Sequence, residues 1–85
     1  MNDLEFDVVD ELYFITSFDL LLNELQLEEG VLRQVLADLY SKGWIRCYEG
    51  PVQLIIDSEV NIEKDYRKYH YLATKAGLLA HRSGG

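Results

Sequence analysis

The sequence has little cysteine and no long apolar run, and each shortage excludes a class of protein. Cys47 is the only cysteine among the 85 residues, so the chain can form neither an internal disulfide nor a cysteine-based zinc site. No apolar run approaches the roughly 18 residues that a membrane-spanning helix needs. The first residues are acidic, where a secretory signal would be basic. We therefore expect a soluble, cytoplasmic protein that makes no contact with a membrane.

Catalytic motifs are also missing from the sequence. The chain contains two histidines, His70 and His81, and neither has a cysteine or a second histidine near it in the sequence. There is no glycine-rich phosphate loop and no nucleophile elbow. Carboxylates are abundant, but they fall at positions expected on helix exteriors, where nothing makes them unusual acids or bases. The sequence thus predicts a protein that is not an enzyme and needs no metal or cofactor.

Basic residues are absent from the first third of the chain. Residues 1–30 contain nine acids and no Lys or Arg, which gives a net charge of −9. Residues 31–85 contain eight bases and six acids, which gives +2 and a total of −7. A polyanion should be repelled by the first third, whereas a surface built from the remainder can face one.

Three N-terminal stretches repeat their apolar residues at helical spacing. The first runs from about Asn2 to Tyr13. A capping box at residues 16–19 predicts the start of a second helix, and the residues just before that helix can pair as a short strand. A third helix begins near Glu28 and ends at Gly43, which suits the left-handed C-cap position. Two such helices joined by a short turn form a helix-turn-helix.

The second half of the chain alternates like antiparallel strands. Residues 44–48 and 69–73 each predict a strand, and residues 52–56 can pair with the first of them as a hairpin. Asp57 and Ser58 can cap a short helical turn that contains Ile62. Thr74 then caps a final helix.

These elements combine into a single α+β domain over residues 1–82, followed by a flexible tail at 83–85. The predicted architecture is a winged helix: three N-terminal helices, a small antiparallel wing sheet and a C-terminal helix. Cys47 is expected to be a small buried hydrophobe within it. The expected centre of the core consists of Leu12, Leu22, Leu25, Leu32, Val35, Leu36, Leu39, Ile45 and Leu79.

Two passages resemble bacterial winged helix-turn-helix regulators of the MarR and PadR kind. Residues 36–46, Leu-Ala-Asp-Leu-Tyr-Ser-Lys-Gly-Trp-Ile-Arg, are similar to the family's passage from the recognition helix into the first wing strand. Residues 71–77, Tyr-Leu-Ala-Thr-Lys-Ala-Gly, are similar to its passage from the second wing strand into the last helix. The sequence departs from the family at Ala73, where leucine is usual, and in its longer wing.

The resemblance implies a transcription-regulator-like protein with duplex DNA as its partner, since the third helix of such domains enters the major groove. Arg33 and Gln34 are of the types that read guanine and adenine edges. A basic and aromatic cluster near the wing adds further bases. The nucleic-acid candidates are Arg33, Gln34, Lys64, Arg67, Lys68 and Lys75. Glu28 and Glu29 oppose this hypothesis, because carboxylates at the helix start would face phosphates.

The alternative is an acidic winged helix that binds protein, or dimerises, and does not bind DNA. The acidic first helix would suit a basic partner, and the tyrosine-rich wing would suit an apolar one. The residues expected to carry these contacts are Asp7, Glu11, Tyr66, Tyr69 and Tyr71. A homodimer is compatible with the same surfaces, and the same charges are also typical of a solvated face. From the residues alone, DNA and a protein partner are nearly even.

Overall fold

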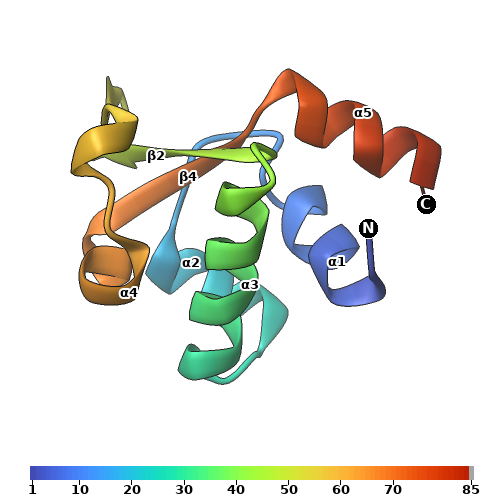
Figure 1. The fold of residues 1–85 in the computed structure, drawn as a ribbon. Coiled ribbons are helices and arrows are strands. Elements are labelled where there is room, and N and C mark those ends of the chain that lie inside the picture. Colours follow the sequence, from blue (N-terminus) through green and yellow to red (C-terminus); the bar gives the residue numbers. More distant parts are fainter. Residues whose placement is uncertain (85) are drawn as a thin grey trace.

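A computed structural model describes residues 1–84 as five α-helices, two 3₁₀ turns and four strands (Figure 1). In chain order the elements are α1 (Asp3–Asp10), β1 (Thr16–Ser17), α2 (Phe18–Leu25), α3 (Glu29–Ser41), β2 (Ile45–Glu49), β3 (Gln53–Leu54), η1 (Asp57–Glu59), α4 (Ile62–Asp65), η2 (Tyr66–Lys68), β4 (Tyr69–Ala73) and α5 (Lys75–Gly84). The predicted α+β winged helix is confirmed, including the short strand before α2. None of the helices within the described residues is long and apolar enough to cross a membrane.

The four strands form one antiparallel sheet in the order β1-β4-β2-β3. In its centre β2 pairs with β4, with Ile45 opposite Ala73 and Cys47 opposite Tyr71. At one edge Tyr48 of β2 lies opposite Leu54 of β3, which makes β2 and β3 the wing hairpin. Figure 1 shows α2 and α3 together on one side of this sheet, while α1 and α5 lie beside each other at the end away from the wing.

Side-chain caps begin the first two helices. Asn2 accepts a hydrogen bond from the Glu5 N–H at 2.7 Å, and the Glu5 side chain accepts from the Asn2 N–H in return. For α2 the capping residue is Ser17, which accepts from the Leu20 N–H, and not Thr16 as the predicted capping box required. Thr16 instead lies in β1, where its buried hydroxyl donates to a main-chain carbonyl. Because Thr16 pairs with Tyr71 of β4 as part of β1, the cap of α2 falls one residue later, at Ser17.

The structure sets where α1 and α3 end and how α5 begins. The first helix ends at Asp10, three residues before the predicted end at Tyr13. Gly43 adopts φ +76° after α3, as expected of a left-handed residue at that position. Thr74 caps α5 by accepting from the Gly77 N–H and donates to the Gly43 carbonyl at 2.8 Å. This threonine thus ties the end of α3 to the start of α5.

The core lies between the helices and the inner face of the sheet. Six of the nine predicted core residues are buried: Leu12, Leu32, Val35, Leu36, Leu39 and Ile45. Leu22 and Leu25 are only partly buried, and the prediction for Leu79 is wrong because its side chain is 53% exposed on α5. Cys47 is buried as predicted, and burial raises the pKa of its thiol to about 12.

The connection from β3 to β4 differs in detail from the prediction. Asp57 begins only the short turn η1, while Ile62 lies in a separate helix, α4, capped by the Asn61 side chain. Ile62 is buried against the core and so holds the connection to the domain. At the other end, α5 continues through Gly84, whereas a tail was predicted from residue 83. Residue 85 of that tail lies outside the described residues.

Candidate interaction surfaces

The start of α3 is bound to η2 by a compact polar cluster. The Glu29 carboxylate accepts hydrogen bonds from the Tyr66 hydroxyl and from both Nε and Nη2 of Arg67, with the Arg67 Nε bond at 3.0 Å. The Arg33 guanidinium lies over the Tyr66 ring, 5.8 Å from its centre. Hydrogen bonds from Tyr66 and Arg67 lower the pKa of Glu29 below its ordinary value. Glu29 is therefore ionised and already paired inside the molecule.

Most of the predicted DNA-contacting residues are engaged within the protein. Gln34 donates to Asp38 at 3.0 Å, one turn further along α3. Lys68 lies 3.8 Å from the Asp65 carboxylate, and Arg67 is paired with Glu29. Lys64 is exposed in α4. The structure thus brings Arg33, Lys64, Arg67 and Lys68 to one side of the domain, but it pairs two of these bases with acids.

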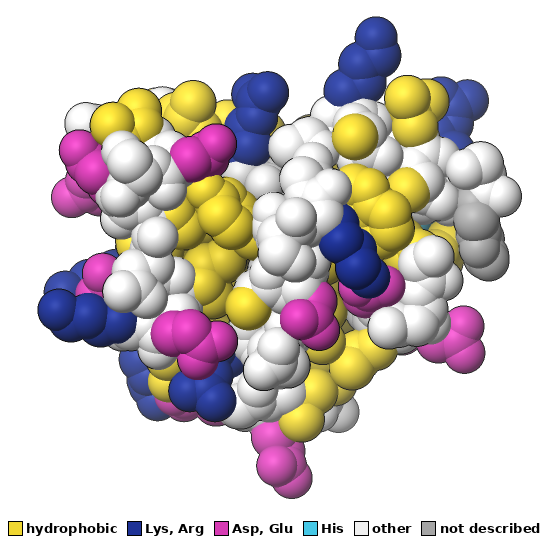
Figure 2. All heavy atoms as spheres, viewed as in Figure 1, with side chains coloured by type: hydrophobic (Ala, Val, Ile, Leu, Met, Phe, Trp, Pro, Cys, Tyr) yellow, Lys and Arg dark blue, Asp and Glu magenta, His cyan; other side chains and the backbone are white. Residues whose placement is uncertain are grey.

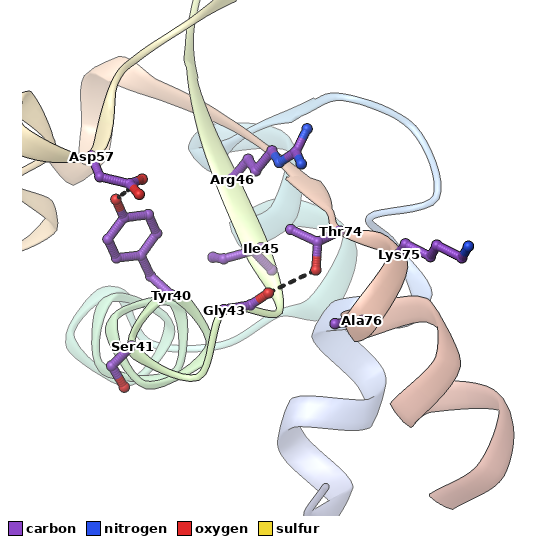
Figure 3. Close-up of a pocket in the computed structure, with 9 residues that line it drawn as sticks. All are labelled: Tyr40, Ser41, Gly43, Ile45, Arg46, Asp57, Thr74, Lys75 and Ala76. Carbon is purple, nitrogen blue, oxygen red and sulfur yellow. Dashed lines mark hydrogen bonds between the residues drawn. The ribbon is translucent and has the colours of Figure 1, made fainter.

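Lys75, the sixth predicted residue, lies apart from that group. It begins α5, which Figure 1 shows well separated from α4. There it borders an open hollow of about 610 Å³ between the end of α3, β2 and the start of α5 (Figure 3). The Tyr40 hydroxyl donates to Asp57 at 2.6 Å across this hollow, and burial raises the pKa of Tyr40 above its ordinary value.

The hollow has no arrangement suited to catalysis or metal binding. The two bases in its lining, Arg46 and Lys75, extend away from Tyr40 and Asp57 in Figure 3. The lining therefore does not place an acid and a base on opposite sides of the hollow, as general acid–base catalysis would need. Within residues 1–84 no three metal-ligating side chains gather at one point. The outer surfaces of the domain are therefore the better candidates for a functional site.

Two of the tyrosines predicted to contact a partner are part of the core, which corrects that prediction. Tyr69 is 6% exposed and Tyr71 is fully buried, because both face inward from β4. The Tyr71 hydroxyl donates to the Tyr66 carbonyl, and the Tyr69 hydroxyl accepts from the Asn61 N–H. Tyr66 is half-buried, with its ring against Phe18. The tyrosines of this segment thus serve packing.

The acidic first helix divides its carboxylates between the interior and solvent. Asp7 is exposed and Glu11 is half-buried at the end of the helix. Glu5 is buried and binds Lys42, with 2.6 Å between Nζ and Oε2. Burial alone would raise the pKa of Glu5, but hydrogen bonds from Lys42 and from the Asn2 N–H lower it below its ordinary value. Among the five residues predicted to contact a protein partner, Asp7 is therefore the most exposed.

The wing carries a feature that the sequence-based prediction missed. Val52, Leu54 and Ile56 are 84%, 48% and 59% exposed, although all three are large and apolar. Figure 2 shows hydrophobic side chains gathered at the wing end of the molecule with acidic side chains beside them. The alternation of apolar residues at 52, 54 and 56 is the available signal, but alternation alone indicates only a hairpin strand.

Comparison with solved structures identifies the fold. The E. coli MarR structure in its apo form and a second structure, titled Multiple Antibiotic Resistance Repressor, both superpose with a TM-score of 0.75 over 98% of this chain. The chain has a MarR-like winged-helix fold. Sequence identity to both is 19%, and the matched region spans 54% and 53% of their chains, so this chain covers about half of MarR. No protein-family model and no curated protein sequence matches the chain.

The charges of α3 and of the wing bear on whether a nucleic acid could be bound. In DNA-binding winged helices the helix at the position of α3 enters the major groove, and the wing lies beside it. Residues 28–42 contain the acids Glu28, Glu29 and Asp38 against the bases Arg33 and Lys42. Residues 45–63, the wing and its continuation into α4, contain four acids against one base, Arg46. Both parts of the surface are therefore net acidic, which opposes contact with phosphates.

Proposed function

We propose that this chain is a non-catalytic winged-helix module that acts in regulation by binding a protein partner and not by reading duplex DNA. The observation that carries the proposal is the net acidic charge of α3 and of residues 45–63, the wing with its continuation into α4; α3 and the wing are the elements that a MarR-like fold would present to DNA. From β2 into α4, residues 45–63 carry four acids against one base, Arg46, so contact of this segment with a phosphate backbone would be repulsive overall. One structural neighbour is a repressor, the Multiple Antibiotic Resistance Repressor, which is compatible with a regulatory role for this chain.

The surface of the wing also has the general features of a protein-binding site. Large apolar side chains are exposed in one place on the wing, with charged residues around them. Exposed apolar patches with a polar rim mark protein interaction sites more often than they mark nucleic-acid sites. The exposed Asp7 on α1 adds a second acidic surface. A partner with basic groups is therefore favoured over an acidic one.

The test is fluorescence anisotropy of a labelled, mixed-sequence DNA duplex at low salt, where even non-specific binding is strongest. We expect no saturable rise in anisotropy with the wild-type protein. A positive control is a basic winged-helix protein titrated under the same conditions. Saturable binding by this chain would contradict the proposal.

Duplex DNA binding is a second candidate, and one observation favours it. Arg33, Lys64, Arg67 and Lys68 lie on the same side of the domain, around Tyr66 and next to the start of α3. Binding through about four phosphates would give a log–log salt slope near −3 to −4. The double variant Arg67→Glu, Lys68→Glu should then abolish binding, whereas Lys75→Glu, at the separate site, should have a smaller effect. The variant Glu29→Gln, which releases Arg67, should strengthen binding if this candidate is correct.

A further inference from the structure

The outer face of the sheet is apolar at the wing. Cross-strand partners share a face, so the pairing of Tyr48 with Leu54, and of Tyr48 with His70, places all three side chains on one face. That face is opposite the buried side chains of Cys47 and Tyr71. Val52 and Ile56, two residues to either side of Leu54, extend it beyond β3 and are more exposed than Leu54 itself. The wing therefore presents an apolar strip along its outer side.

The backbone of β3 is free at the edge of the sheet. The strand order places β3 last, with β2 on its inner side. Ile55 donates its N–H inward to the Cys47 carbonyl at 3.0 Å, so the N–H and C=O of its neighbour Leu54 point away from β2. An edge strand with outward backbone groups is a template for pairing with another extended chain. Neither proline nor lysine blocks this edge within residues 52–56.

The rim of the strip is acidic. Glu49, Asp57 and Glu59 are exposed on the wing and its continuation into η1, and Arg46, beside Leu54 and Ile56, is the one base of residues 45–63. The carboxylate of Asp57 is held in place by the Tyr40 hydroxyl. Glu49, Glu59 and Asp65 also border a shallow hollow of about 220 Å³ beside the half-buried Ile55, with Lys68, which pairs with Asp65, as the one base in its lining. A bound strand would therefore meet apolar side chains in its middle and a net negative charge along its flanks, where Glu49, Asp57 and Glu59 outnumber Arg46.

We propose that the free edge of β3 binds an extended segment of a partner protein in which apolar residues alternate with Lys or Arg. The inference rests on the proposed protein-binding function and names the site and the chemistry of the partner. The backbone of the segment would pair with Leu54, its apolar side chains would cover Val52, Leu54 and Ile56, and its cations would face Glu49 and Glu59.

Charge decides against other occupants of the same edge. A second copy of this chain would bring two acidic wings, in molecules of net charge −7 each, into direct contact. An anionic membrane surface would be repelled by the same carboxylates. Nucleic acid is opposed for the same reason. A cationic, apolar polypeptide is the occupant that satisfies the backbone edge, the apolar strip and the acidic rim together.

The experiment is an amide chemical-shift titration of the labelled full chain with a short peptide that alternates valine and lysine. We expect shifts at residues 52–57 and in β2, and we expect them to weaken as salt rises. Leu54→Ser should weaken the affinity for the peptide at least tenfold. Leu79→Ser is the matched control, since Leu79 is similarly exposed but lies on α5, and it should leave the affinity unchanged. A peptide that alternates valine and glutamate should not bind.

Several results would overturn the wing site. They are the absence of wing shifts at about 1 mM peptide, equal binding of the glutamate peptide, or equal weakening by both serine variants. Concentration-dependent dimerisation through β3 would assign the edge to a second copy. If the wing fails these tests while duplex DNA still does not bind, the protein-binding function stands and only this site is rejected. Binding of duplex DNA would reject the function itself.

Discussion

Strands β3 and β4 belong to the same sheet, but their apolar side chains lie in very different surroundings. In β4 the side chains of Tyr69, Tyr71 and Ala73 are all buried. In β3 and the residues beside it, Val52 and Leu54 are exposed. In both segments apolar side chains occur at every second position. The difference arises from the face that the side chains occupy: those of Tyr69, Tyr71 and Ala73 point toward the helices beneath the sheet, whereas Leu54 lies on the uncovered outer face, at the edge of the sheet.

This contrast shows that the fold uses one apolar pattern for two purposes. Where helices cover the pattern, it supplies the core, and removal of an apolar side chain should unfold the domain more easily. Where no strand lies beyond it, as at β3, the same pattern remains available to a partner. Substitutions that compare covered and uncovered positions test this distinction directly, because the two kinds of position should respond by very different amounts.

The largest effect is expected for a leucine under the sheet. Leu36 is fully buried on α3, so Leu36→Ala should lower the free energy of unfolding by about 2 to 5 kcal/mol. Leu54→Ala makes the same chemical change in the wing and should alter stability by less than about 0.5 kcal/mol. Urea denaturation followed by circular dichroism measures both. Equal losses would show that the wing leucine is packed as tightly as the core.

The next effect concerns the junction between β2 and α5. A Cβ atom at Gly77 would lie 2.1 Å from the Trp44 carbonyl oxygen and 3.0 Å from its carbon, so backbone would have to move. Gly77→Ala should therefore destabilise the domain by about 1 to 3 kcal/mol or more.

Gly30 provides the matched control for this substitution. It lies in α3, and a Cβ atom added there would have no neighbour within 4 Å, so Gly30→Ala should stabilise the helix by about 0.5 to 1 kcal/mol. Thermal melts of both variants give the comparison. A melting temperature for Gly77→Ala at or above that of the wild type would contradict the close approach of α5 to Trp44, the residue just before β2.

The smallest effect separates a buried carboxylate from an exposed one. Glu5→Gln removes a charged partner of Lys42 and should lower stability by about 1 to 2 kcal/mol at neutral pH. Because the pKa of Glu5 is lowered in the folded protein, its contribution is present above its unfolded pKa and is lost as pH falls through the folded value. The difference between wild type and variant should thus shrink on acidification.

Glu59→Gln is the exposed counterpart of this change. Glu59 lies on η1 in solvent, so its substitution should change stability by less than about 0.5 kcal/mol at neutral pH. Denaturation curves at neutral and acidic pH provide the measurement for both variants. A stability difference for Glu5→Gln that grows toward low pH would show that the Glu5–Lys42 pair does not stabilise the fold.

Much of the fold was predictable because local signals agreed with the tertiary structure. The periodic leucines of α3, the glycine after it and the threonine before α5 each fulfilled a local requirement that no other part of the chain opposed. The prediction for Leu79 failed because an apolar residue on the last helix has no means of showing, in sequence, whether another layer covers it.

The candidate sites were less predictable, and the reasons are physical. In the sequence Arg67 looks like an unpaired surface cation, because its partner Glu29 is 38 residues away. Only the packing of η2 near the start of α3 brings the two side chains together. Tyr71 has the pattern of a surface tyrosine, because strand alternation gives two faces without saying which one is covered. Val52 and Leu54 have the pattern of ordinary strand residues, although the strand order leaves them exposed.

Local periodicity and the sum of charges were enough to specify the winged-helix architecture, the burial of Cys47 and the acidic character of residues 1–30. The packing of the whole domain settled the rest: which apolar residues are core and which form a surface, and which bases are neutralised. Burial and ion pairing depend on neighbours that are distant in the chain, and only the folded arrangement brings those neighbours together.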